Sequence, residues 1–155
     1  MTFASAGWKR YYENVETLEV MKYADYINVM TYDQVGGTSP YTGHHTALGW
    51  IRMNDLKNTP AGDYLESRKE EMAKRGIKYE PASAEMIIDY CLKKGVKPEQ
   101  IVIGAAFYGR AWKGVAPKNN GLYQANKGVY VGWGAYHNIR KKYENKNGFK
   151  RYWDS

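Results

Sequence analysis

Two polar pairs in this sequence carry side chains that could take part in chemistry. Tyr32 and Asp33 end one hydrophobic segment, and Tyr108 and Arg110 lie near the end of another. A guanidinium beside a carboxylate keeps the carboxylate ionised and oriented, and the two phenols add hydrogen-bond donors. Such a group suits the recognition of a polar ligand. A structural ion pair between packed tyrosines is the alternative, and the residue types leave both open.

The first pair is expected to end a strand over residues 26–33, Tyr-Ile-Asn-Val-Met-Thr-Tyr-Asp, which is rich in β-branched and aromatic residues. Because side chains alternate along a strand, one face carries Tyr26, Asn28, Met30 and Tyr32, and the other carries Ile27, Val29 and Thr31. The first face is too polar for a plain core and is typical of a barrel interior near a site. Asp33 then lies at the C-terminal end of a buried strand, where α/β enzymes hold their chemistry.

The second pair is expected on a strand over residues 100–112. Strand alternation predicts that one face carries Val102, Gly104, Ala106, Tyr108 and Arg110. Small residues deep in this strand would leave room for a ligand near its tip. If the two strands are neighbours in a parallel sheet, Asp33 and Arg110 meet at the same end.

Periodicity and turn residues predict the remaining elements. We expect a short strand over 1–7, helices over 14–22, 63–75 and 83–94, and a long loop over 36–60. The helix over 83–94 has Ser83 as its cap, and its apolar stripe consists of Met86, Ile87, Tyr90 and Cys91. The helix over 63–75 is so charged that we place it outside the core. Strands that alternate with helices predict a parallel α/β sheet.

The composition changes after Trp112, where glycines and aromatic residues become frequent. A helix over 135–143 and several short antiparallel strands are expected there. The sequence therefore predicts two domains, an α/β segment over residues 1–112 and a small α+β appendage over 113–155.

The chain has 155 residues, of which 43% are hydrophobic and 15% aromatic, enough for a real core. Tyrosine and tryptophan surfaces suit sugar rings, although half-buried packing explains the 15 tyrosines equally well. The formal net charge is +7, but no run of Lys and Arg is long enough to track a phosphate backbone, so no nucleic-acid partner is expected. No stretch has the length of a membrane span, and we expect no membrane partner.

No metal or other cofactor is expected. His44 and His45 are adjacent, and adjacent residues rarely bind one ion together. No Gly-x-Gly-x-x-Gly motif opens a helix, so a phosphate-binding loop is not predicted. Cys91 is the single cysteine, and its place in an apolar helical pattern predicts a buried thiol.

Several segments together resemble the family-18 glycoside hydrolases, the chitinase family. Residues 26–33 resemble the Met-x-Tyr-Asp strand of that family, which is barrel strand six, and residues 42–48 resemble the loop that follows it. Residues 2–7 are similar to strand five and residues 100–112 to strand seven. Residues 121–154 resemble the small α+β insertion that follows strand seven in many chitinases.

The resemblance implies a partial (β/α)8 TIM barrel with a small α+β insertion domain. It also implies a secreted parent enzyme that hydrolyses β-1,4 links between N-acetylglucosamine units by substrate-assisted retaining catalysis, in which the sugar's acetamido oxygen attacks the anomeric carbon. Chitin or its oligosaccharides would be the partner. Tyr32 would hold the acetamido group and Met30 would line the floor of the site. Asp33 would bind sugar hydroxyls, with Tyr108 and Arg110 helping from the next strand.

The family's general acid is the Glu of an Asp-x-x-Asp-x-Asp-x-Glu strand, and no segment of this sequence matches that motif. We therefore expect that the chain alone is inactive and that a complete site needs the missing half of the barrel. Met1 is not followed by a recognisable signal peptide. Two other readings stay open: a catalytically inactive, chitin-binding lectin of the same family, and an interaction module unrelated to carbohydrate.

Overall fold

A computed structural model describes residues 1–76, 80–130 and 134–154 of the chain. The chain divides into two compact units. The first unit comprises residues 1–34, 44–55 and 68–106, and the second unit comprises residues 35–43, 56–67 and 107–155.

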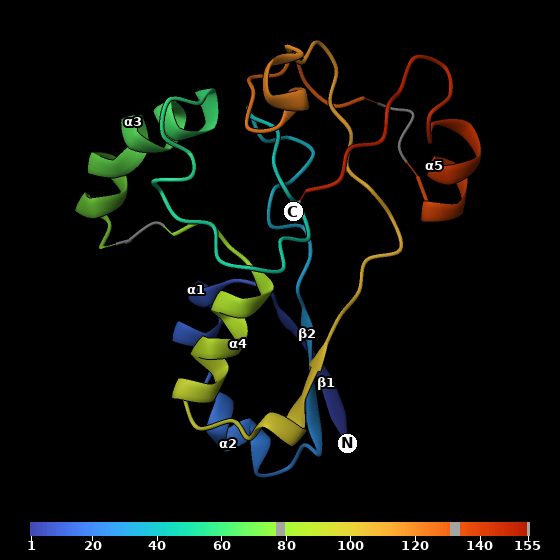
Figure 1. Cartoon of the computed structure of the whole chain (residues 1–155). Helices are drawn as coiled ribbons and strands as arrows, with labels where there is room; N and C mark the ends of the chain where they lie inside the picture. The colour runs from blue at the N-terminus through green and yellow to red at the C-terminus, as the bar shows by residue number, and fades with distance from the viewer. Residues whose placement is uncertain (77–79, 131–133, 155) are drawn as a thin grey trace. The chain divides into compact units, whose positions relative to one another are not determined.

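The helices and strands of both units are short (Figure 1). In chain order they are β1 Thr2–Ala6, α1 Lys9–Glu13, α2 Thr17–Met21, β2 Tyr26–Met30, α3 Pro60–Lys74, α4 Ala84–Lys93, the 3-10 helix η1 Pro98–Gln100, β3 Ile101–Ile103, the 3-10 helix η2 Lys118–Gly121, and α5 Tyr136–Lys142. Every expected helix is present, and α1 is an additional helix that the sequence prediction missed. None of the described helices is long and apolar enough to cross a bilayer.

The first unit is built on a parallel three-stranded sheet in the order β1-β2-β3. In the central strand β2, Ile27 pairs with Phe3 of β1 and with Ile101 of β3. Figure 1 shows α1, α2 and α4 on the same side of this sheet. The predicted parallel α/β arrangement is confirmed for this unit.

The core of the first unit lies between the sheet and these helices. Ile27 and Val29 are completely buried and belong to one cluster with Ile87 and Cys91 of α4. Ser83 caps α4 by accepting a hydrogen bond from the Met86 amide at 3.2 Å, as predicted. Burial raises the pKa of the Cys91 thiol, which therefore stays protonated and packs as a small apolar group.

A hydroxyl pair is enclosed in the same core. The Ser5 and Tyr12 oxygens lie 2.7 Å apart and are buried. Desolvation raises the pKa of Tyr12 above its ordinary value, so this phenol remains neutral. The pair satisfies both hydroxyls, which lets β1 and α1 pack together without an unpaired polar group.

Both strands that were expected to carry the site are shorter than predicted. β2 ends at Met30, because the Thr31 amide turns back to donate to the Val29 carbonyl at 2.9 Å. β3 ends at Ile103, and the Gly104 amide donates to the same Val29 carbonyl at 2.8 Å. The predicted alternation of buried residues holds on β2. The strand predicted over residues 100–112 is wrong beyond Ile103, although exposure still alternates from Gly104 to Tyr108.

The second unit has fewer regular elements than expected. Its described residues form isolated antiparallel bridges, such as Trp112 with Val129, in place of the predicted antiparallel strands. Thr42 joins its loop to a distant segment, donating its amide to the Gln124 carbonyl at 2.8 Å. Residues 131–133, within the expected insertion, lie outside the described residues.

Helix α3 begins three residues earlier than predicted and ends before Gly76, whose φ of +68° is the left-handed conformation expected of a helix stop. The helix is not wholly outside a core. Ala61 and Leu65 are buried, so the prediction from its charge was only partly right.

Candidate active site at the end of the central strand

Tyr32 and Asp33 lie two and three residues after the end of β2 in the first unit. Asp33 has a φ of 59°, in the left-handed region that few residues other than glycine adopt. Asp tolerates this conformation better than most residues, and strained backbone of this kind gathers at functional sites. The turn places a phenol and a carboxylate side by side at the C-terminal end of the central strand.

A histidine lies beside the carboxylate. The Nδ1 atom of His45 is 3.8 Å from Oδ1 of Asp33. The His45 side chain is 13% exposed and the Asp33 side chain 35% exposed. A protonated imidazole at this distance favours the ionised carboxylate. From the sequence, His45 was weighed as a metal ligand beside His44, whereas in the structure it is a neighbour of Asp33. The described ranges contain no group of three or more His, Cys, Asp or Glu side chains that could hold a metal ion.

Gln34 holds the histidine loop against the strand end. Its amide donates to the His45 carbonyl at 3.2 Å, and its side-chain oxygen accepts from the Ala47 amide at 2.6 Å. Its side-chain nitrogen donates to the carbonyls of Thr31 and Ala47, both at 3.4 Å. One half-buried side chain therefore connects the strand end to the loop that carries His45.

A Gln34→Ala substitution is expected to lower the free energy of unfolding by about 1–2 kcal/mol, because it leaves partly buried backbone groups of the loop unpaired. Urea denaturation followed by tryptophan fluorescence would measure this loss. Gln100→Ala is the matched control, since the side chain of Gln100 accepts an exposed 3.4 Å bond from the Lys97 amide. Equal losses in the two variants would contradict the role given to Gln34.

Gly104 provides room for the ring of Tyr32. A Cβ atom at Gly104 would lie 3.1 Å from Cε1 of Tyr32 and 2.8 Å from the Val29 carbonyl oxygen. The Thr31 hydroxyl donates to the Gly104 carbonyl at 2.8 Å and ties the two strand ends together. The small residue was expected to leave space for a ligand, and part of that space is taken by the tyrosine ring.

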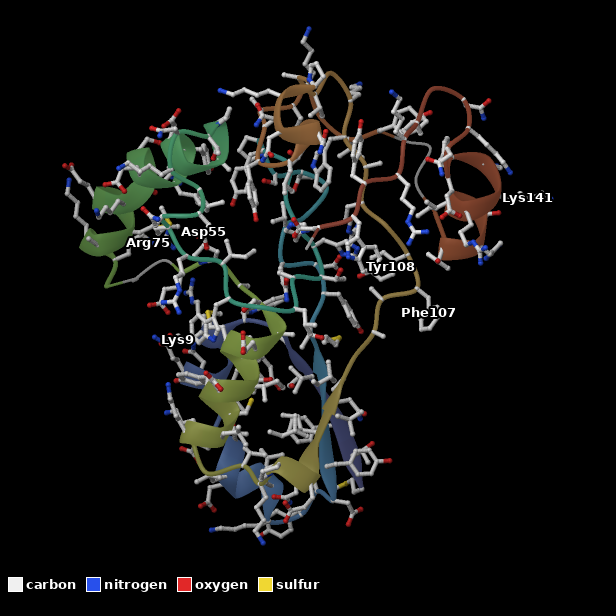
Figure 2. The ribbon with its side chains drawn as sticks, in the orientation of Figure 1. Lys9, Asp55, Arg75, Phe107, Tyr108 and Lys141 are labelled. Atoms are coloured by element: carbon white, nitrogen blue, oxygen red, sulfur yellow. The ribbon has the colours of Figure 1, made fainter. Side chains whose placement is uncertain are left out.

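Tyr108 and Arg110 belong to the second unit and lie together there. The guanidinium carbon of Arg110 is 5.2 Å from the centre of the Tyr108 ring, within the range of a cation–π interaction. Tyr108 forms an antiparallel bridge with Ala135, which fixes the backbone of this segment. Figure 2 shows Tyr108 on the opposite side of the chain from the exposed Phe107.

The structure thus brings the predicted residues together as two groups. Met30, Tyr32 and Asp33 lie at the end of β2 in the first unit, while Tyr108 and Arg110 form a pair in the second unit. Arg110 lies seven residues beyond the end of β3 and not at the strand end, which corrects the prediction for that strand. The convergence of Asp33 with Arg110 stays a prediction.

Comparison with known proteins identifies the class to which this fold and site belong. The model of the glycosyl hydrolases family 18 matches residues 1–155, the whole chain. Chitinase A1 of Niallia circulans is 30% identical over 160 residues, an alignment that covers 99% of this chain and 20% of the relative. The chain belongs to glycosyl hydrolase family 18.

Solved structures agree with this assignment. A family-18 N-acetylglucosaminidase from Paenibacillus barengoltzii matches with a TM-score of 0.75 and 34% identity, over 99% of this chain and 38% of that one. The cell-surface-expressed, multi-modular chitinase ChiW from Paenibacillus sp. str. FPU-7 matches with a TM-score of 0.76 and 32% identity, over 99% of this chain and 15% of that one. The fold is therefore of the TIM-barrel type, and this chain spans well under half the length of each relative.

Proposed function

We propose that these 155 residues form part of a chitinase catalytic domain that hydrolyses β-1,4 links between N-acetylglucosamine units. One observation carries the proposal: a phenol and a carboxylate, Tyr32 and Asp33, lie within three residues of the end of the central parallel strand, with His45 3.8 Å from the carboxylate. This is the rim at which barrel enzymes hold their chemistry. The chitinase and N-acetylglucosaminidase relatives support the choice of substrate.

In the proposed reaction the acetamido oxygen of the substrate attacks the anomeric carbon, so the protein supplies no nucleophile. Tyr32 hydrogen-bonds the acetamido group and holds it in line for attack. Asp33, whose carboxylate lies 3.8 Å from Nδ1 of His45, binds sugar hydroxyls around the cleavage point. The leaving oxygen takes its proton from a general acid, for which no segment of this sequence has the family's motif.

The remaining roles are proposed from the same family resemblance. Met30 lines the floor of the sugar site, and Tyr108 and Arg110 bind sugar hydroxyls. Residues 1–112 provide barrel strands five to seven, and residues 113–155 provide an incomplete α+β insertion. The other barrel strands complete the site, so the chain alone does not hydrolyse chitin. The full-length protein acts outside the cell.

The test compares chitotetraose with cellotetraose, which has a hydroxyl in place of each acetamido group. The full-length protein is expected to bind chitotetraose at least about tenfold more tightly, because cellotetraose leaves the acetamido partners unpaired. Calorimetric titration would measure both affinities, and product analysis would show hydrolysis. Equal affinities would contradict the proposed substrate, whereas tight binding without turnover would favour the lectin reading.

A further inference from the structure

The positive charge of this chain is concentrated in one short stretch. Residues 140–151 carry six cationic side chains and one carboxylate, which is +5 of the chain's formal net charge of +7. Three of the cations, Arg140, Lys141 and Lys142, form the last turn of α5, where positive charge is favoured by the helix dipole. The remaining chain is therefore almost neutral, and the second unit has a strongly basic surface.

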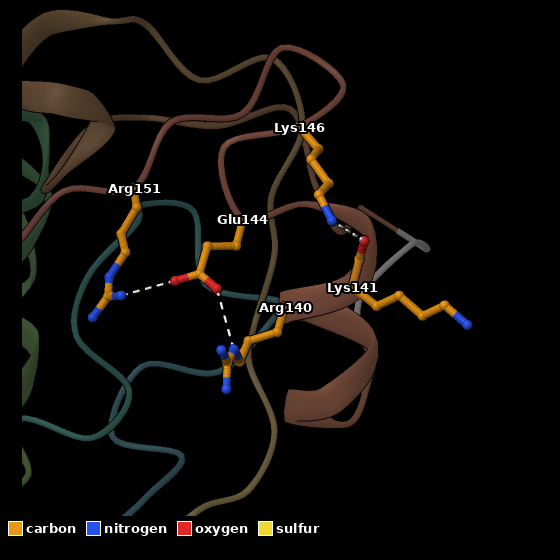
Figure 3. Close-up of polar contacts among 5 residues, drawn as sticks. All are labelled: Arg140, Lys141, Glu144, Lys146 and Arg151. Atoms are coloured by element: carbon orange, nitrogen blue, oxygen red, sulfur yellow. Dashed lines mark hydrogen bonds and ion pairs between the residues drawn. The ribbon is translucent and has the colours of Figure 1, made fainter.

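The carboxylate of Glu144 organises this stretch. Its Oε2 lies 3.3 Å from Nε of Arg140, and its Oε1 lies 2.8 Å from Nη1 of Arg151 (Figure 3). Nζ of Lys146 donates to the Lys141 carbonyl at 3.2 Å at the end of the helix. In Figure 3 the side chain of Lys141 extends away from the ion pairs. One carboxylate holds two arginines in place, and the exposed ammonium group of Lys141 extends away from them, where a ligand could reach it.

Two surface hollows meet at this ion pair. One, of about 550 Å³, is lined by Lys141 and Lys146 together with His137. The other, of about 290 Å³, is lined by the rings of Tyr136, Tyr143 and Phe149. Arg140 and Glu144 line both hollows, so a basic surface and an aromatic surface are continuous.

We infer that residues 136–151 form a binding surface for an acidic polysaccharide. Exposed aromatic faces stack against sugar rings, and Tyr136 and Phe149 are 50% and 48% exposed. Arginine and lysine pair with carboxylate or sulfate groups on alternate sugars. A neutral polymer such as chitin would make no use of the charge.

Charge and shape favour an acidic polysaccharide over a nucleic acid. Binding along a phosphate backbone calls for cations spaced along an extended groove. Here Arg140, Lys150 and Arg151 line the hollow that carries the aromatic rings. Lys141 and Lys146 line the other hollow, beside a helix of seven residues. That arrangement suits a chain of separated anionic groups joined by apolar ring faces.

Oligogalacturonate is the probe for the test, titrated against the 155-residue chain at low salt. Lys141→Gln combined with Lys142→Gln is expected to lower the affinity about five- to tenfold, because two exposed cations are lost while Glu144 keeps both arginines. Lys93→Gln combined with Lys94→Gln removes the same charge from the end of α4 and is expected to change the affinity less than about twofold.

A second variant tests the aromatic half. Tyr136→Ala is expected to lower the affinity for oligogalacturonate about threefold and to leave the affinity for inorganic polyphosphate, which has no rings, unchanged. The inference would be overturned if the chain did not bind oligogalacturonate, or if the two lysine double variants lost equal affinity. It would also be overturned if Tyr136→Ala weakened the binding of both probes equally. Tighter binding of single-stranded DNA than of oligogalacturonate would overturn it in favour of a nucleic acid.

Discussion

A Tyr32→Phe variant of the full-length protein is expected to hydrolyse chitotetraose about 100-fold more slowly, the usual size of effect when one preorganised donor to the reacting group is lost. The ring of Tyr32 packs close to the backbone at Gly104, where an added Cβ atom would lie 3.1 Å from its Cε1. Phenylalanine fills the same space, so the ring stays in place. The loss of rate then reports the hydroxyl alone.

Steady-state kinetics would separate the two parts of this effect. Because the hydroxyl orients the acetamido group for attack, kcat should fall much more than KM rises. Tyr23→Phe is the control, since Tyr23 is 75% exposed and lies before the strand. An unchanged kcat in Tyr32→Phe would remove the proposed role of Tyr32 while leaving the family assignment intact.

The parts of the fold that the sequence predicted well are those decided by local periodicity. The buried face of β2 follows from the alternation of Ile27 and Val29, and α4 follows from its Ser83 cap and apolar stripe. The strand ends were not predictable, because they depend on the Val29 carbonyl accepting two amides, one of them from Gly104. Helix α1 was missed because Tyr12 is its one buried side chain, and the partner of Tyr12 is the Ser5 hydroxyl on strand β1.

The site shows the same division. Tyr32 and Asp33 could be recognised from their position after a hydrophobic segment, and the structure confirms that they follow β2. His45 and Gln34 were missed as members of the site, because hydrogen bonds from Gln34 to residues more than ten positions later bring their loop back to the strand end.

Gly7→Ala is expected to destabilise the chain by about 3 kcal/mol, at the upper end of what overpacking costs. A Cβ atom at Gly7 would lie 2.1 Å from the carbonyl oxygen of Met30 and 3.2 Å from Cα of Thr31. Both are backbone atoms, so the clash cannot be relieved by a side-chain rotation. Either β1 separates from the end of β2 or the turn that carries Tyr32 and Asp33 moves.

Urea denaturation followed by far-UV circular dichroism measures the loss, and Gly36→Ala is the matched control. Gly36 has no described atom within 4 Å of an added Cβ and does not adopt a left-handed φ. Its substitution should change the free energy of unfolding by no more than about 0.5 kcal/mol. Similar midpoints for the two variants would mean that β1 and β2 do not pack closely at Gly7. That result would also contradict the idea that the packing of β1 supports the turn with Tyr32 and Asp33, because this turn begins at the same Met30 carbonyl.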